Sequence, residues 1–235
     1  METTAGAIVT GGSQGIGYAI AEALLKRGMR VAITGRDAGR LAAAAQRLGA
    51  GDRVLRLAGD VGDATVAQAL VDQAAAAFGG LDVLVNNAGI GLFGNVSDFS
   101  VEDWDRLVAT NVSGVFYCTR AAIPHLRRRG GGWVINISSL AGVNPFPGAA
   151  AYCASKAALD AFTMALMQEV RHDGIRVAAI APGSVATGFS GRRGEDGADW
   201  KLAPADVAQV VVDLIAHPSR SLPSRVELRP SRPRR

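Results

Sequence analysis

The chain has 235 residues, of which 49% are hydrophobic and 20% are charged, a composition typical of a globular protein and not of a disordered one. Its formal net charge is +4. Four arginines in the last seven residues, Arg229, Arg232, Arg234 and Arg235, account for all of this charge, so we expect no nucleic-acid partner. Because α/β sheets often reach this size as one unit, we expect one domain over residues 1–229 and a basic tail over 230–235.

The cysteines, the histidines and the N-terminus exclude several further classes. Cys118 and Cys153 stand in apolar helical patterns without CxxC spacing, which predicts buried thiols in a reducing compartment. His125, His172 and His217 are scattered, so we expect no metal site. The first residues enter a strand without the pattern of a signal peptide, and no apolar run reaches the roughly 18 residues that span a bilayer. We therefore expect a soluble, cytoplasmic protein that does not cross a membrane.

Short β-branched runs alternate with longer alanine-rich amphipathic segments, the pattern of successive βα units. In chain order we expect a strand at 7–10, a helix at 16–27, a strand at 30–34, a helix at 38–48, a strand at 53–57, a helix at 63–78, a strand at 81–86, one long helix from 100 or 101 to 128, a strand at 133–137, a helix at 149–172, a strand at 175–180, a mobile loop at 182–204, a helix at 206–216 and an edge strand at 225–228. This order predicts an α/β fold: a single-domain, Rossmann-like, doubly wound parallel sheet of about seven strands with helices on both faces.

The first strand leads into a glycine-rich turn, TGGSQGIG at 10–17, and then into a helix. Glycines at such a turn let backbone amides approach a pyrophosphate, and the helix N-terminus favours negative charge. A glycine-rich turn alone is a weak signal, but its place between strand and helix predicts a nucleotide-binding site.

The end of the second strand indicates which nicotinamide cofactor is bound. A carboxylate there would bind the ribose hydroxyls of NAD, whereas an arginine accommodates the 2′-phosphate of NADP. The chain has Gly35 and then Arg36, with Arg40 one helical turn later. We therefore expect NADP(H) to be preferred over NAD(H). Asp60, after the third strand, is a candidate partner for the adenine amino group.

Tyr152 and Lys156 form a Y-x-x-x-K pair on one face of a predicted helix. A phenol titrates near pH ~10, and a neighbouring ammonium lowers that pKa, which suits general acid–base chemistry on a carbonyl. Ser138 and Ser139 follow the fifth strand, at the sheet edge where such folds bind ligands. Either serine can donate a hydrogen bond to a developing alkoxide.

Further motifs occur in a fixed order along the chain: GDV at 59–61, NNAG at 86–89, Asn111, and PGSVAT at 182–187. Together with the glycine turn and the serine, tyrosine and lysine residues, they resemble the short-chain dehydrogenase/reductase family, in its compact branch, over almost the whole chain. The resemblance implies a catalytic tetrad of Asn111, Ser139, Tyr152 and Lys156, since the family's serine lies thirteen residues before the tyrosine.

The resemblance also implies a role for each member of the tetrad. Tyr152 would exchange a proton with the substrate, and Ser139 would hold and polarise the carbonyl oxygen. Lys156 would lower the tyrosine pKa and bind the nicotinamide ribose, and Asn111 would hold a water that links Lys156 to solvent.

The family uses the NNAG segment to stabilise the sheet and line the adenine–ribose side, and the PG-x-V-x-T stretch to contact the carboxamide and phosphate end of the cofactor. The expected cofactor-binding residues are Gly11, Ser13, Gln14, Gly15, Ile16, Gly17, Arg36, Asp60, Val61, Asn87, Ala88, Gly89, Tyr152, Lys156, Pro182, Gly183, Val185 and Thr187.

Two departures from the family pattern put carrier-protein substrates in doubt. The C-terminal PSRVELRPSRPRR replaces the T-G-Q…D-G-G stretch of many members, and Asp173 stands where ketoacyl-carrier-protein reductases tend to have arginine. The basic run at 127–129 could compensate. Substrate identity depends largely on the segment 188–204, where Phe189, Trp200 and Leu202 are the expected apolar lid residues.

We therefore expect an oxidoreductase that moves hydride between NADP(H) and a carbonyl or secondary alcohol, with Tyr152 as general acid and base. The alternatives are a 3-oxoacyl thioester reductase, a dehydrogenase of 3-hydroxy acids or β-hydroxy amino acids, an enzyme for bulkier ketones, and a catalytically silent nucleotide-binding sensor. The intact Ser139–Tyr152–Lys156 set favours an enzyme. Small apolar residues on the two long helices predict a homodimer or homotetramer.

Overall fold

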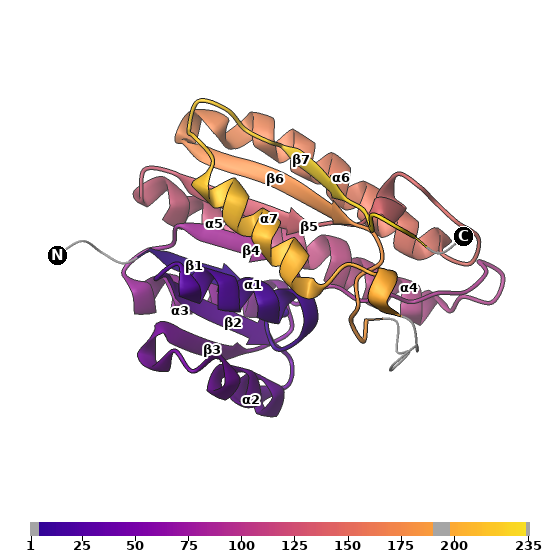
Figure 1. The fold of residues 1–235 in the computed structure, drawn as a ribbon, viewed down its shortest axis with the longest axis horizontal. Helices are drawn as coiled ribbons and strands as arrows, with labels where there is room; N and C mark the ends of the chain where they lie inside the picture. The colour runs from indigo at the N-terminus through magenta and orange to yellow at the C-terminus, as the bar shows by residue number, and fades with distance from the viewer. Residues whose placement is uncertain (1–4, 190–197, 234–235) are drawn as a thin grey trace.

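The computed structural model describes residues 5–189 and 198–233, which form a seven-stranded parallel sheet covered by helices (Figure 1). The strand order is β3-β2-β1-β4-β5-β6-β7, and every neighbouring pair is parallel. The expected Rossmann-like, doubly wound α/β fold is confirmed, with β7 as the expected edge strand.

The strands are β1 (Gly6–Val9), β2 (Arg30–Gly35), β3 (Val54–Ala58), β4 (Val83–Asn86), β5 (Gly132–Ile137), β6 (Ile175–Pro182) and β7 (Arg225–Leu228). The α-helices are α1 (Gly15–Lys26), α2 (Ala38–Leu48), α3 (Ala64–Phe78), α4 (Val101–Val108), α5 (Gly114–Arg128), α6 (Ala150–Val170) and α7 (Pro204–Ala216). These ends lie within two residues of those expected, apart from the break between α4 and α5.

Alternate side chains of the central strands enter two separate cores, as the twofold repeat of a strand requires. On one face α1, α2 and α7 cover residues such as Val9 and Ile33. On the other face α3, α5 and α6 cover residues such as Ile8 and Leu84. The central strands are apolar because both of their faces are buried.

The strand order reverses at β1, which pairs with β2 on one side and with β4 on the other. Doubly wound sheets bind ligands outside the carboxyl ends of the strands at such a point. The loops that leave β1, β4, β5 and β6 at this edge carry the glycine turn, the NNAG segment, the two serines and the PGSVAT stretch. The topology therefore brings together motifs that are far apart in the sequence.

The expectation of one long helix from 101 to 128 is wrong in one respect. A π-helical turn at Ala109–Ser113 separates α4 from α5. This turn contains Asn111, which is buried and whose side chain bonds the backbone of Ile90. Because a π turn adds a single residue, it hardly alters the apolar periodicity of the sequence, and such turns are frequent at functional sites.

The segment expected as a mobile loop, 182–204, is partly ordered. β6 extends to Pro182, Val185 forms a bridge with Leu202, and a 3₁₀ turn spans Ala198–Trp200. Residues 190–197 of this segment lie outside the described residues.

Buried polar side chains fasten two helices to the middle of the sheet. Asn86 on β4 faces Asn136 on β5, and its Nδ2 donates to Asn136 Oδ1 at 2.8 Å and to Thr119 Oγ1 on α5 at 3.0 Å. Asn136 Nδ2 donates to Thr163 Oγ1 on α6 at 2.8 Å. Since all four residues are buried, these bonds hold α5 and α6 in one position on the sheet.

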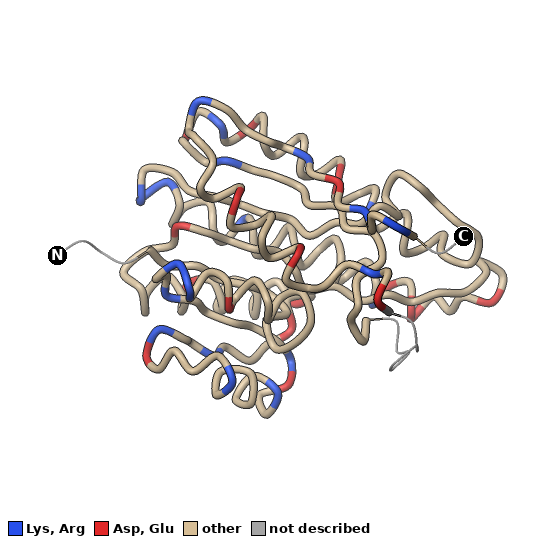
Figure 2. The backbone as a smooth tube through the Cα atoms, viewed as in Figure 1, with Lys and Arg blue, Asp and Glu red and all other residues tan. Residues whose placement is uncertain are grey.

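Charged residues are distributed over the helices, the loops and the other strands (Figure 2), and β1, β4 and β5 contain none. Within the described residues, no helix has the length and apolar character needed to cross a membrane, and no three His, Cys, Asp or Glu side chains cluster as a metal site would require. Cys118 and Cys153 are buried free thiols.

Candidate active site

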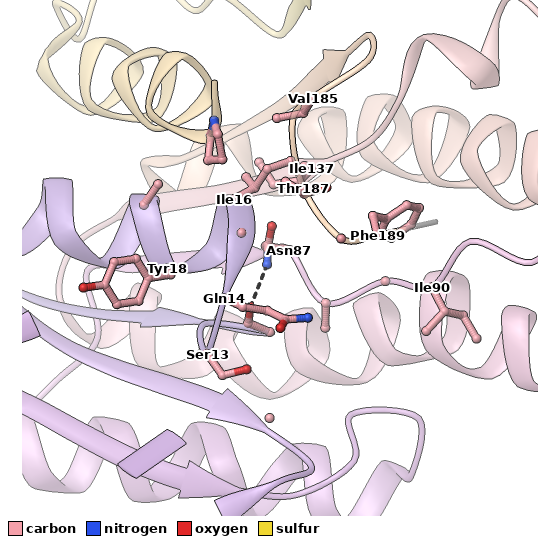
Figure 3. A pocket seen from close by; sticks show the side chains of 18 of the residues that line it. Ser13, Gln14, Ile16, Tyr18, Asn87, Ile90, Ile137, Val185, Thr187 and Phe189 are labelled. Carbon is pink, nitrogen blue, oxygen red and sulfur yellow. Dashed lines mark hydrogen bonds between the residues drawn. The ribbon is translucent and has the colours of Figure 1, made fainter. Parts of the chain in front are cut away.

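A cleft of about 920 Å³ runs along the carboxyl edge of the sheet. Tyr18 lies at one end, Ile90 and Phe189 lie at the other, and Asn87 lies between them (Figure 3). Ser139, Tyr152 and Lys156 of the expected tetrad line the cleft. All the other expected cofactor-binding residues except Gly17 line it as well. Arg36 and Asp60, expected at the adenine end of the cofactor, therefore share one continuous cavity with Ser139, Tyr152 and Lys156.

The glycine turn forms the floor of the cleft and fits a phosphate group. Gly11 and Gly15 have φ angles of 65° and 57°, which L side chains rarely adopt. Gly17 faces the backbone of Gly11 so closely that a Cβ would overlap the Gly11 carbonyl oxygen. Helix α1 has no side-chain cap and no acidic residue in its first turn, which leaves its N-terminal amides available to an anion.

The NNAG segment fixes this turn from the side. Asn87 Nδ2 donates to the carbonyl oxygens of Thr10 and Gly11 at 2.9 and 3.2 Å. The Thr10 hydroxyl accepts from the backbone amides of Asn87 and Ala88, both at 3.0 Å. These bonds tie the ends of β1 and β4 together, so the expected stabilising role of NNAG has a direct structural basis.

Arg36, Arg40 and Asp60 line the end of the cleft next to β2 and β3. Arg36 Nη1 lies 3.9 Å from Asp60 Oδ2, and both side chains are exposed. Asp37, which the sequence reasoning did not weigh, also lines this end. Its Oδ1 accepts from the Arg40 amide at 2.9 Å and its Oδ2 lies 3.4 Å from Arg40 Nε, so the carboxylate caps α2.

Tyr152 and Lys156 lie on the buried side of α6, at the opposite end of the cleft. Lys156 Nζ lies 5.9 Å from the centroid of the Tyr152 ring and donates to the Ile137 carbonyl oxygen at 2.9 Å. Ile137 is the last residue of β5, so this bond joins the helix to the end of the sheet. The expected Tyr–Lys pair is thus brought to the carboxyl edge.

Burial lowers the pKa of Lys156 from its ordinary 10.5 to about 8, and the nearby carboxylate of Asp160 opposes this change. Asp160 itself is buried and lies 3.2 Å from Arg225 Nη1 on β7. The sequence reasoning missed both residues. The signal that could have found Asp160 is its spacing, four residues after Lys156 on the same helical face.

Burial raises the pKa of Tyr152, and a hydrogen bond with Ser139 lowers it by less. The net direction is opposite to the one expected from the neighbouring lysine. The physical reason is that the phenol is covered: only 8% of Tyr152 is exposed, and the rings of Phe93 and Phe189 lie against it. The protonated phenol is therefore the dominant form at neutral pH.

The structure distinguishes the two serines that the sequence left open. The Ser138 hydroxyl is buried and donates to the Lys156 carbonyl oxygen at 3.5 Å. Ser139 bonds Tyr152 and caps the 3₁₀ turn Leu140–Gly142, where its Oγ accepts from the Ala141 amide at 3.1 Å. Ser139 therefore lies where it can contact both a substrate oxygen and the phenol.

Asn111 lies outside the lining of the cleft and joins three segments behind it. Its Oδ1 accepts from the Ile90 amide at 2.8 Å, and its Nδ2 donates to the Ile90 carbonyl at 2.9 Å and to Ser155 Oγ at 3.1 Å. The side chain thus fixes the loop after β4 against α6, next to Lys156. The expected water bound by Asn111 stays a prediction.

The PGSVAT stretch covers the cleft from the β6 side. Gly183 N donates to the Leu228 carbonyl at 2.8 Å, and Pro230 Cδ lies 3.1 Å from where a Gly183 Cβ would be. Thr187 faces Gly15, because a Cβ added to Gly15 would lie 3.3 Å from a side-chain atom of Thr187. The strand β7 and the beginning of the basic tail therefore hold the segment that closes the site.

These features define a nucleotide-binding α/β protein with a Ser–Tyr–Lys set at one end of its cleft. A family-wide sequence model described as short chain dehydrogenase matches residues 5–198. The chain belongs to the short-chain dehydrogenase/reductase family, whose members are oxidoreductases that bind a nicotinamide cofactor.

Relatives match nearly the full length of the chain. An uncharacterized oxidoreductase of Staphylococcus saprophyticus is 36% identical over 226 residues, covering 95% of this chain and 96% of its own. The alcohol dehydrogenase of Thermococcus sibiricus, solved with 5-hydroxy-NADP, superposes with a TM-score of 0.90 at 30% identity and 99% and 100% coverage. A short chain dehydrogenase of Burkholderia cenocepacia, solved with NADP, has a TM-score of 0.87 at 35% identity, with 97% of each chain covered.

The lowered pKa of Lys156 predicts a pH-dependent contribution to stability. Between pH 8 and pH 10.5 the unfolded chain holds more protons at this residue than the folded chain, so the free energy of unfolding rises with pH. Lys156→Met removes this titration. Between about pH 8 and pH 10 we expect the free energy of unfolding of the wild type to rise by about 2 kcal/mol relative to that of the variant.

Urea unfolding followed by circular dichroism at several pH values measures this difference. Lys26→Met, at an exposed lysine paired with Glu22, serves as the control and should show no such trend. If the difference in the free energy of unfolding between the wild type and Lys156→Met stays constant across this pH range, the lowered pKa of Lys156 would be contradicted.

Proposed function

We propose that the protein is an NADP(H)-dependent oxidoreductase that interconverts a carbonyl compound and a secondary alcohol. The observation that carries the proposal is the placement of Ser139, Tyr152 and Lys156 at one end of a cleft whose other end presents the glycine turn and Arg36. This arrangement supplies a proton donor, an oxygen-binding hydroxyl and a phosphate-binding turn in one cavity.

The cleft fits a dinucleotide along its length. The amides of the turn at 11–17 would hold the pyrophosphate, and Arg36 with Arg40 would hold a phosphate on the adenine ribose. Asp60 and Val61 would flank the adenine, and Lys156 and the PGSVAT stretch would hold the nicotinamide end. When bound in its reduced form, the nicotinamide supplies a hydride, and with it two electrons, to the carbonyl carbon.

The residues of the chain complete the reaction at the oxygen. Ser139 donates a hydrogen bond to the carbonyl oxygen and so stabilises its developing negative charge. Tyr152 transfers its phenolic proton to that oxygen, which becomes the hydroxyl of the product. The raised pKa of Tyr152 keeps this proton on the phenol at neutral pH, which is the protonation state that carbonyl reduction requires.

A proton must then return to Tyr152. Lys156 stabilises the phenolate by its charge, and its own pKa of about 8 lets it exchange protons near neutral pH. Asn111, bound to the loop beside Lys156, would hold the water through which solvent replaces the proton. The net reaction consumes one hydride and one proton for each carbonyl reduced.

A carrier-protein thioester finds less support as a substrate. Arg127 Nη2 lies 2.7 Å from Asp173, Arg128 contacts His125, and Arg129 Nε lies 3.0 Å from Asp82. The basic run at 127–129 is therefore engaged within the chain and is not a free patch for an acidic partner. A silent sensor, another of the alternatives, would have no need of a buried Tyr–Lys pair.

Tyr152→Phe tests the proposed mechanism directly. The substitution removes the proton-carrying oxygen and keeps the ring, so we expect kcat to fall by about 10²-fold or more. The affinity for NADPH, measured by calorimetry, should change little. Tyr117→Phe, on α5 outside the cleft, is the matched control and should retain normal turnover. A Tyr152→Phe enzyme that keeps more than about a tenth of wild-type kcat would rule this mechanism out.

Substitutions at Arg36 and Gly35 test the proposed preference for NADP(H) over NAD(H). A charge-assisted contact from Arg36 to the 2′-phosphate gives roughly 10- to 100-fold preference, so Arg36→Ala should remove most of it. A Cβ at Gly35 meets no atom closer than 3.7 Å, so Gly35→Asp can be accommodated and should favour NADH. The measurement is the ratio of kcat/KM for NADPH and NADH. A wild type that prefers NADH, or a ratio insensitive to Arg36→Ala, would exclude NADP(H) as the preferred cofactor.

We also propose that the protein is a homodimer or a larger homo-oligomer. On α6, Ala157, Ala158, Ala161 and Ala165 are exposed, together with Met164, which is 38% exposed. A second copy packed on this apolar face is the simplest cover. We expect light scattering to give at least twice the 24.2 kDa chain mass, and Ala161→Arg to weaken assembly. Ala43→Arg, at an exposed alanine of α2, is the control, and a wild type that stays at 24.2 kDa at micromolar concentration would refute the proposal.

A further inference from the structure

Three phenylalanine rings from three separate loops gather beside Tyr152. Phe93 follows β4, Phe146 precedes α6, and Phe189 follows β6. The centroids of the Phe93 and Phe189 rings lie 5.4 and 6.0 Å from that of Tyr152. Phe146 stacks on Phe93 with a centroid distance of 6.4 Å and an interplanar angle of 28°. We call these three residues the phenylalanine cluster.

The positions of two of these rings depend on a glycine. An added Cβ at Gly91 would lie 2.5 Å from Phe189 Cε1 and 3.1 Å from Phe93 Cε2, so both rings rest on this backbone. Ile90, next to it, lies with Phe189 at the end of the cleft opposite Tyr18 (Figure 3). Phe189 therefore lines the end of the cavity where the carbonyl would react, Phe93 lies against Tyr152 at that end, and Phe146 extends the cluster outward from Phe93.

The cluster leaves much aromatic surface uncovered. Phe93, Phe146 and Phe189 are 47%, 50% and 44% exposed, although Tyr152 between them is only 8% exposed. Exposed aromatic side chains that converge from separate loops at the mouth of a cavity are typical of a binding surface. A flat aromatic ring can cover such faces in offset or tilted contacts and loses little conformational freedom on binding.

The described segments that carry the cluster have no charged side chains. The three segments that carry it, residues 86–97, 138–152 and 182–189, contain no aspartate, glutamate, lysine, arginine or histidine. The polar side chains at the reacting end include Ser139 and Tyr152, which the carbonyl oxygen would use, and Lys156, which the cofactor ribose would use. A carboxylate on the substrate would find no partner in these described segments and would lose its hydration.

We infer that the substrate is an uncharged aryl ketone, whose ring lies among Phe93, Phe146 and Phe189 while its carbonyl oxygen meets Tyr152 and Ser139. This inference rests on the proposed function. The product is the corresponding benzylic alcohol, with the hydride on its carbon and the proton of Tyr152 on its oxygen.

Three ketones with NADPH separate ring character from charge: acetophenone, cyclohexyl methyl ketone, which has a saturated ring of the same size, and benzoylformate, which adds a carboxylate. We expect kcat/KM for acetophenone to exceed that for the cyclohexyl ketone roughly 3- to 10-fold, as an aromatic contact provides. Benzoylformate should be at least about 100-fold poorer. Calorimetry with the same ketones should give the same order of affinity.

Substitutions in the phenylalanine cluster provide a second test of the inference. Phe146→Leu and Phe93→Leu keep apolar bulk but remove a ring, so each should reduce the preference for acetophenone over the cyclohexyl ketone to near parity, while the affinity for NADPH stays the same. Trp104→Leu, at an aromatic residue on α4 that is 44% exposed and lies outside the cluster, is the matched control and should keep the preference.

Failure of this inference is distinguishable from failure of the proposed function. With the reaction still abolished by Tyr152→Phe, reduction of the cyclohexyl ketone as fast as acetophenone would overturn the aryl assignment, and equally fast reduction of benzoylformate would overturn the assignment of an uncharged substrate; the proposed function would stand in both cases. Turnover of acetophenone that Tyr152→Phe leaves intact, or the absence of any NADPH-dependent ketone reduction, would overturn the proposed function and the inference with it.

Discussion

The arrangement of the site depends on the hydrogen bond from Lys156 Nζ to the Ile137 carbonyl, 2.9 Å long. An ammonium group that is almost fully buried needs such a partner, because an unpaired buried charge is costly. The bond fixes α6 to the end of β5 and so places the Tyr152 ring beside the loops after β4 and β6. The buried Asn86–Asn136 pair holds the same helix to the sheet farther back. The reactive groups are thus positioned by the core of the fold.

Burial then sets the proton chemistry of these groups. It raises the pKa of Tyr152 and lowers the pKa of Lys156, so the acid becomes weaker and the ammonium gives up its proton more readily. Ser139 and Asp160 act in the opposite direction on the two groups. The result is a phenol that stays protonated at neutral pH until a carbonyl oxygen accepts the proton. The apolar rings of Phe93 and Phe189 produce this state by covering the phenol.

Much of this architecture could be predicted from the sequence, because apolar runs buried on both faces mark the strands, and motifs at strand ends meet at one sheet edge. The Tyr152–Lys156 spacing and the glycine turn are local signals of the same kind. Three features escaped prediction. The π turn at Asn111 hardly disturbs the helical periodicity, the pKa direction of Tyr152 depends on rings from distant loops, and the contact between Asp160 and Arg225 joins positions 65 residues apart.

The central claim is that hydride goes to a carbonyl carbon in the cleft while Tyr152 gives the proton to the oxygen. A single turnover with NADPH deuterated at the transferable position of nicotinamide C4, acetophenone as acceptor and ordinary water as solvent tests this directly. The account predicts an alcohol that carries one deuterium on its carbinol carbon, with the hydroxyl proton derived from solvent, when the product is analysed by mass spectrometry and NMR. An alcohol without deuterium at that carbon would contradict it.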